Sequence, residues 1–187
     1  TSQSYAYNAQ KVKNSSKIWV NSPVLKVEKT TDKPFYKYGD IITYRIVLTQ
    51  EQTGCVARNV TLQDVIDTQG VRLLKDSVIL MDEKGNVADA DVQINDDNTF
   101  LMSTGRTLVR DSRYSICDND KGGLFEQVMY NPLDCQEQKS MIVEYQAAVI
   151  DAALAGQKVH NTAVADSSEK IPATGETETE VHSPILE

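Results

Sequence analysis

The sequence lacks most of the features that mark membrane-spanning, nucleic-acid-binding or catalytic proteins. Its 187 residues include no run of about 18 apolar residues, and no basic segment followed by an apolar one opens it, so we expect neither a membrane span nor a signal peptide. The net charge is −8 and no basic cluster is present, which argues against a nucleic-acid partner. No Gly-x-Ser-x-Gly motif and no glycine-rich loop before a helix occurs, so no site for catalytic turnover is expected.

Cysteine is also scarce. The three cysteines lack the spacing of a zinc site, and an odd number cannot all pair. A disulfide between Cys117 and Cys135 would close a loop of intermediate size. The alternative, in which both remain unpaired thiols, is equally open. The carboxylates of residues 118–123 resemble a calcium loop, but the glutamate expected at its twelfth position is absent, which favours a solvated turn. We therefore expect no metal and no cofactor.

Short segments rich in β-branched residues dominate what is present. The predicted strands are residues 41–49, 59–65, 77–81, 141–149 and 159–164. Glycine, asparagine and aspartate between them mark tight turns. Only residues 151–155 are suited to a helical turn, which is too short to set the fold class. Many short strands with turn signals between them predict an all-β sandwich.

A repeated motif suggests how the chain is organised. The segment Val20-Asn-Ser-Pro-Val-Leu-Lys26 is similar to Val181-His-Ser-Pro-Ile-Leu-Glu187, so the second copy would open another unit of a tandem array. We therefore expect a linker or the tail of a preceding unit at 1–21, a β-sandwich repeat domain at 22–166, and a linker with the start of the next repeat at 167–187. The last assignment depends on the Ser, Thr, Glu and Pro content of that region, which is typical of a hydrated linker.

Several stretches resemble the isopeptide-forming repeat domains of Gram-positive fimbrial shaft proteins and surface adhesins. The stretches are Pro23-Val-Leu-Lys-Val-Glu-Lys29, Tyr38-Gly-Asp-Ile-Ile-Thr-Tyr44, Asn59-Val-Thr-Leu-Gln-Asp64 and Val159-His-Asn-Thr-Ala-Val164. The resemblance implies an immunoglobulin-like (collagen-adhesin A-type) β-sandwich with a long insertion. It also implies an extracellular place on the bacterial surface, with attachment to the cell wall through parts of the protein outside this chain, and neighbouring repeats as partners.

Strand alternation tests whether the polar residues of these motifs can meet. If Leu25 and Val27 point inward, then Lys29 does too, because side chains alternate between the two faces of a strand. By the same count, Asp64 and Asn161 share the inward faces of their own strands. Three polar groups are thus predicted to face one apolar interior.

The resemblance implies a covalent role for these residues. Burial lowers the pKa of a lysine and raises that of an aspartate, which favours a neutral amine and a protonated acid. Lys29 would attack the side-chain carbonyl of Asn161, with Asp64, or alternatively Glu144, as the acid. If the first and last strands lie side by side, this single-turnover amide bond would join the two ends of the domain. Other readings are that Lys29 extends to solvent, Asp64 caps a turn, or Asn161 bonds only to backbone.

A second function from another class is also open. Residues 99–138 match no part of the family pattern and contain arginines and aromatic residues suited to a contact surface. On this reading the chain is an adhesin module that binds a host protein or glycan through that insertion, without a covalent cross-link.

Overall fold

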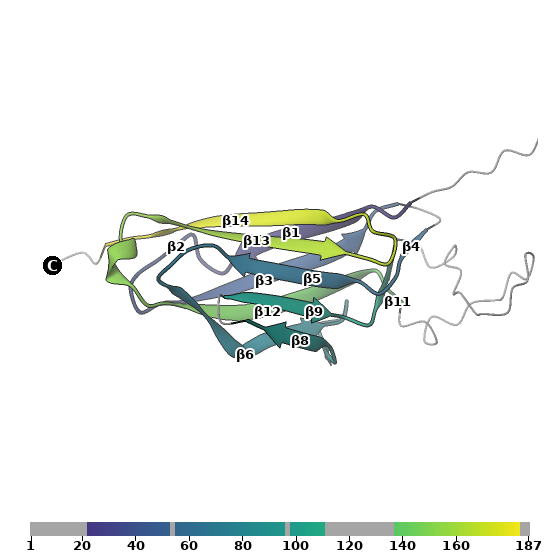
Figure 1. Cartoon of the computed structure of the whole chain (residues 1–187), viewed down its shortest axis with the longest axis horizontal. Helices are drawn as coiled ribbons and strands as arrows, with labels where there is room; N and C mark the ends of the chain where they lie inside the picture. The colour runs from purple at the N-terminus through teal and green to yellow at the C-terminus, as the bar shows by residue number, and fades with distance from the viewer. Residues whose placement is uncertain (1–21, 53–54, 96–97, 111–136, 184–187) are drawn as a thin grey trace, which may run out of the picture.

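The computed structural model describes residues 22–52, 55–95, 98–110 and 137–183 and folds most of them into two facing sheets (Figure 1). The first sheet has the order β1 (Leu25–Thr31), β3 (Ile41–Gln50), β12 (Ser140–Val149), β6 (Val71–Met81) and β7 (Val87–Ala88). The second has the order β2 (Phe35–Tyr36), β14 (Ala173–Val181), β13 (Lys158–Asp166), β5 (Thr61–Ile66), β9 (Thr99–Ser103) and β8 (Asp91–Ile94). A small third sheet contains β11 (Glu137–Gln138), β10 (Thr107–Val109) and β4 (Val56–Ala57). The prediction of an all-β sandwich is therefore confirmed.

The core lies between the two large sheets. Buried and exposed positions alternate along β1, β3 and β12, so that one face of the first sheet is apolar and the other is in contact with solvent. The largest side chains of this interior are fully buried, among them Tyr44, Tyr145 and Phe100. Complete burial of an apolar side chain such as that of Phe100 contributes on the order of 1.5–3 kcal/mol relative to exposure. Residues 151–155 contain one short 3-10 turn, Ala152–Leu154, as the sequence predicted.

Strand β14 corrects the prediction of a hydrated linker after residue 166. It pairs along its whole length with β13, in antiparallel register from Lys158↔Glu180 to Ala165↔Ala173. Its inward positions include Gly175, Thr179 and Val181, whereas its glutamates point to solvent, where Glu178 forms a 2.5 Å ion pair with Lys158. The glutamate-rich composition that suggested a linker is thus the exposed face of a strand in the sheet.

The proposed insertion at 99–138 is also partly corrected. Strand β9 lies inside the second sheet between β5 and β8, and Phe100 and Met102 are fully buried there. Leu108 in β10 is fully buried as well. Both strands are short, with five residues in β9 and three in β10, and apolar residues adjoin the buried ones, so the sequence does not show a clear strand alternation here. Residues 111–136 of the predicted insertion lie outside the described residues.

The sequence suggested that the first strand and the strand that carries Asn161 lie side by side in one sheet, but they do not. Strand β1 is an edge strand of the first sheet, whereas β13 belongs to the second, and the two face each other across the core. Strand β1 also lies against β14, so closely that a Cβ atom on Gly175 would stand 2.7 Å from the backbone oxygen of Val27. The two sheets therefore meet along this side of the sandwich. In the described ranges, no helix is long and apolar enough to cross a membrane.

Candidate functional site

Three polar residues from three strands meet in the apolar interior between the sheets. Lys29 comes from β1, Asp64 from β5 and Asn161 from β13. The side chain of Lys29 is 0% exposed, and Asp64 and Asn161 as whole residues are 0% and 1% exposed. The prediction that strand alternation turns all three inward is confirmed. A lysine and an aspartate are seldom buried this deeply unless they are paired or take part in chemistry.

The amine of Lys29 lies between the two other side chains. Its Nζ forms an ion pair with Oδ2 of Asp64 and donates a hydrogen bond to Oδ1 of Asn161 at 2.6 Å. The structure thus brings the nitrogen of Lys29 next to the carbonyl group that the sequence predicted it to attack. The alternative in which Lys29 extends to solvent is wrong, because its side chain is enclosed.

Tyr145, which the sequence analysis did not assign to the site, completes the cluster from β12. Its hydroxyl donates to Oδ1 of Asp64 at 2.6 Å and accepts a hydrogen bond from Nδ2 of Asn161 at 2.5 Å. Its ring is stacked on that of Tyr44 at 5.0 Å and meets the edge of Phe100 at 5.1 Å. These aromatic contacts hold the phenol in place, because neighbouring rings in a close-packed core restrict its rotation.

Burial dominates the electrostatics of this cluster. Loss of hydration lowers the pKa of the Lys29 amine from its ordinary value of 10.5 to about 8, even though the charge of Asp64 acts to raise it. Loss of hydration likewise raises the pKa of the Asp64 carboxyl, against the effect of the neighbouring Lys29. It also raises the pKa of the Tyr145 phenol well above its usual range. Both shifts in the Lys29–Asp64 pair favour a neutral amine next to a protonated acid.

Glu144, the alternative acid, lies outside the cluster. It occupies the solvent-facing side of β12, where its side chain is 30% exposed and forms an ion pair with Arg45 of the adjacent strand β3. Because side chains alternate along a strand, the position that brings Tyr145 inward turns Glu144 outward. The geometry therefore favours Asp64 over Glu144 as the acid.

The cysteines offer no further chemistry in the described residues. Cys55 is a free thiol, partly buried, and its Sγ donates to the carbonyl of Gln52 at 3.5 Å. Burial raises the pKa of this thiol, which lowers its reactivity. Cys117 and Cys135 lie outside the described residues, so the disulfide between them stays a prediction. Within the described ranges, no group of three metal-ligating side chains is found.

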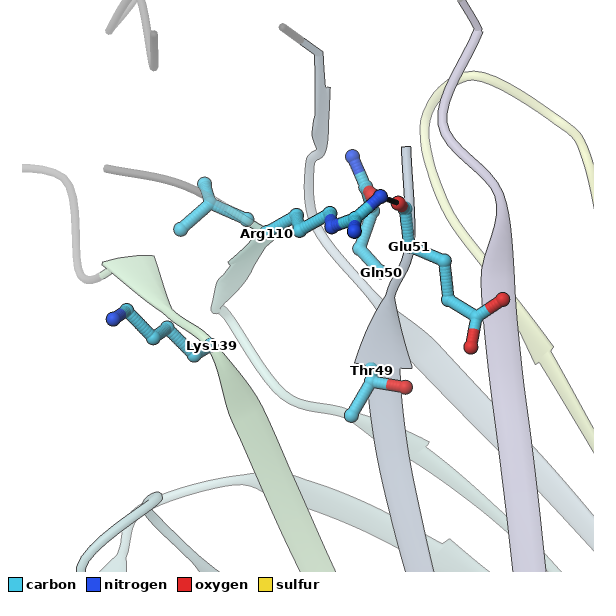
Figure 2. Close-up of a pocket in the computed structure, with 6 residues that line it drawn as sticks. Thr49, Gln50, Glu51, Arg110 and Lys139 are labelled. Atoms are coloured by element: carbon cyan, nitrogen blue, oxygen red, sulfur yellow. Dashed lines mark hydrogen bonds between the residues drawn. The ribbon is translucent and has the colours of Figure 1, made fainter. Parts of the chain in front are cut away.

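A pocket lies at the end of β3 and includes two residues of the predicted binding segment 99–138, Val109 and Arg110 (Figure 2). Its lining is Thr49, Gln50, Glu51, Val109, Arg110 and Lys139. Figure 2 shows the guanidinium of Arg110 directed at the backbone oxygen of Glu51, to which it donates at 2.7 Å. The side-chain amide of Gln50 also binds the backbone, because it donates a hydrogen bond to the carbonyl of Cys55. Arg110 and Gln50 of this pocket thus hold loops together, and ligand binding through residues 99–138 stays a prediction.

Comparisons with known proteins identify the fold. No family model and no curated protein matches the chain. The solved structures similar to it include the major pilin subunit BcpA of Bacillus cereus, with 10% identity and a TM-score of 0.54. They also include the full-length major pilin SpaD of Corynebacterium diphtheriae, with 15% identity and a TM-score of 0.51, and the T6 backbone pilin of serotype M6 Streptococcus pyogenes, with 14% and 0.50.

The similarity extends over most of this chain but over a minor part of each pilin. It covers 87% of the chain and 40% of BcpA, 83% and 34% of SpaD, and 87% and 36% of the T6 pilin. The chain thus has the immunoglobulin-like sandwich fold that the sequence predicted, and it spans two fifths or less of the pilins that share it. At these identities the likeness describes the fold alone.

Proposed function

We propose that this chain is a structural repeat module of a bacterial fimbria or surface adhesin, stabilised by an autocatalytic isopeptide bond between Lys29 and Asn161. The observation that carries the proposal is the enclosed amine of Lys29, which contacts both the Asn161 carbonyl oxygen and the Asp64 carboxyl in an apolar interior. The shared fold with backbone pilins supports the structural role. The proposed location is the bacterial cell surface, with neighbouring repeats as the main partners and a host protein or glycan as a further one.

The reaction is an amide exchange. Neutral Lys29 attacks Cγ of Asn161 through its Nζ lone pair, and the carbonyl π electrons move to Oδ1. Nζ then loses a proton, Nδ2 gains one, and the Cγ–Nδ2 bond breaks to release ammonia. Asp64 accepts the proton from the lysine side and supplies one toward the leaving nitrogen, so it is unchanged at the end. The new bond is made once, and the chain is therefore not an enzyme in the sense of turnover.

The bond would connect the two sheets. Because β1 and β13 belong to opposite sheets, the new amide would cross the core instead of joining neighbouring strands. Three aromatic rings exclude water from the site, which protects the neutral amine and the acid from hydration until they react. A cross-linked sandwich of this kind would suit a module that is pulled along its length.

Intact mass spectrometry of the purified chain tests the proposal. We expect a mass lower than that of the sequence by one ammonia, about 17 Da, and a fragment in which Lys29 is joined to Asn161. Lys29→Met and Asp64→Ala should restore the full mass. Glu144→Gln is the matched control, because it alters a carboxylate on the same part of the sandwich but on the solvent face, and it should keep the loss. A full mass for the unaltered chain would rule out the cross-link.

A further inference from the structure

The proposed reaction needs a path by which a proton reaches Nδ2, the leaving nitrogen of Asn161. Both carboxyl oxygens of Asp64 are already engaged, Oδ2 with the amine of Lys29 and Oδ1 with the hydroxyl of Tyr145. Nδ2 of Asn161, the atom that departs as ammonia, is 2.5 Å from the same Tyr145 hydroxyl. The phenol oxygen therefore bridges the acid and the leaving group.

We propose that the Tyr145 hydroxyl relays a proton from Asp64 to the departing nitrogen of Asn161. This inference depends on the proposed cross-link and assigns a catalytic role within it to a residue that contacts a reacting atom. In the resting site Nδ2 of Asn161 donates to Tyr145 because an amide nitrogen has no basic lone pair. Once Lys29 has added to the carbonyl, that nitrogen becomes an amine whose lone pair accepts a proton.

The transfers balance over the closed circuit. For the transfer, both hydrogen bonds of the phenol reverse from their resting direction, so that protonated Oδ1 of Asp64 donates to the oxygen of Tyr145 and the Tyr145 hydroxyl turns to Nδ2. Nζ of Lys29 then gives a proton to Oδ2 of Asp64, Oδ1 gives its proton to the oxygen of Tyr145, and Tyr145 gives its own proton to Nδ2. The Cγ–Nδ2 bond then breaks and ammonia leaves. Asp64 and Tyr145 finish with the number of protons with which they began, and the proton lost by the lysine leaves as part of ammonia.

The surroundings of the phenol suit a relay. Tyr145 is fully buried, and the rings of Tyr44 and Phe100 fix its plane. A hydrogen-bonded chain in a dry interior transfers protons without reorganising solvent. The competing route is direct proton transfer from Asp64 to Nδ2 of Asn161. The two routes differ in whether they need the hydroxyl of Tyr145.

A time course of cell-free synthesis, followed by intact mass, distinguishes the two routes. Tyr145→Phe keeps the ring and removes the relay, so we expect loss of ammonia to slow by about 100-fold or more, the lower range for general acid catalysis. Tyr36→Phe is the matched control, because it removes the hydroxyl of another buried tyrosine, which donates to Asp32 and lies outside the cluster of Lys29, Asp64 and Asn161. Its rate should stay near that of the unaltered chain.

The outcomes separate the relay from the cross-link itself. If Tyr145→Phe folds and loses ammonia at the normal rate, the relay is wrong and the cross-link stands. If the unaltered chain never loses ammonia, the cross-link fails and the relay with it. Should Tyr145→Phe not fold, 3-fluorotyrosine at position 145 alone replaces it, since it keeps the shape and makes the phenol more acidic. The relay then predicts faster loss of ammonia, and an unchanged rate would refute it.

Discussion

The stability that the proposed bond confers can be calculated from its position in the chain. Lys29 and Asn161 are 132 positions apart, so the bond would close most of the domain into one loop. In the chain-entropy model, a cross-link around a loop of this length destabilises the unfolded state by about 5 kcal/mol at 25 °C. At about 2–4 °C per kcal/mol for a domain of this size, its loss would lower the melting temperature by about 10–20 °C.

A double-mutant cycle isolates that contribution. In the unaltered chain, Asn161→Ala removes the bond together with the packing and hydrogen bonds of the side chain. In an Asp64→Asn background the bond does not form, so the same substitution removes the side-chain contacts alone. The difference between the two losses in free energy of unfolding is the contribution of the bond, which we expect to be about 5 kcal/mol.

The assay is urea-induced unfolding of all four chains, with the mass of each checked first. The mass must show loss of ammonia in the unaltered chain and in none of the other three. A coupling below about 1 kcal/mol in chains that pass this check would refute the reasoning from loop entropy, because the bond would then exist without stabilising the fold.

Two further predictions concern packing and pH. Gly175→Ala should destabilise the chain by about 1–3 kcal/mol in thermal unfolding, because the new Cβ would stand 2.6 Å from Cγ1 of Val27. The control, Glu176→Ala on the exposed face of the same strand, should change stability by at most about 0.5 kcal/mol. Equal effects of the two substitutions would show that the sheets separate easily here. In the Asn161→Ala variant, Lys29 keeps a free amine, whose pKa is about 8 in the folded chain and 10.5 in the unfolded chain. Between these two pH values unfolding takes up a proton, so the free energy of unfolding should rise with pH across that window. The cross-linked chain has no such amine and should lack this rise in urea unfolding; a rise of the same size in both chains would contradict the assignment.

The inward direction of the three polar residues could be predicted from the sequence because it depends on strand parity alone. Lys29 follows Leu25 and Val27 at alternate positions, and Asp64 likewise follows Val60 and Leu62. Asn161 lies between Val159 and Ala163 in the same alternation. The periodicity of a strand is fixed by its pleat, so the prediction needed no knowledge of which strands are neighbours. The prediction that the three side chains meet at one point did need that knowledge. It came from the resemblance to a known family, because periodicity does not show which strands are neighbours.

The role of Tyr145 could not be found in the same way. Alternation along β12 does place it in the core with Met141 and Val143, but nothing in the sequence distinguishes a tyrosine that fills space from one that contacts Asp64. The contact depends on β12 and β5 facing each other from opposite sheets. Hydrogen bonds between such strands are set by topology, which single-sequence patterns do not determine.

Strand β14 was missed because composition masked its alternation. In the run Thr177-Glu178-Thr179-Glu180-Val181 only the last residue is apolar, and glutamate is uncommon in strands. In a sandwich the outer face of each sheet remains in water, so an inward set of Gly, Thr and Val is enough to pack the strand. The available signal was the alternation of residues with a period of two along this polar segment. The prediction of a linker followed the composition of the segment instead.

The position of β14 determines what the proposed bond would protect. Figure 1 shows the described chain entering β1 at one end of the sandwich and leaving β14 at the other. Tension applied along this axis would pass from Lys29 directly to Asn161 and bypass the strands between them. Strand β14 follows Asn161 and lies outside that loop, held by its ladder with β13, by the short pairing with β2 and by the contact of Gly175 with β1. The ladder runs parallel to the axis of tension, so its hydrogen bonds would be loaded together in shear. The load that the module bears before it extends would therefore be set by β14, while the bond keeps the rest of the sandwich folded.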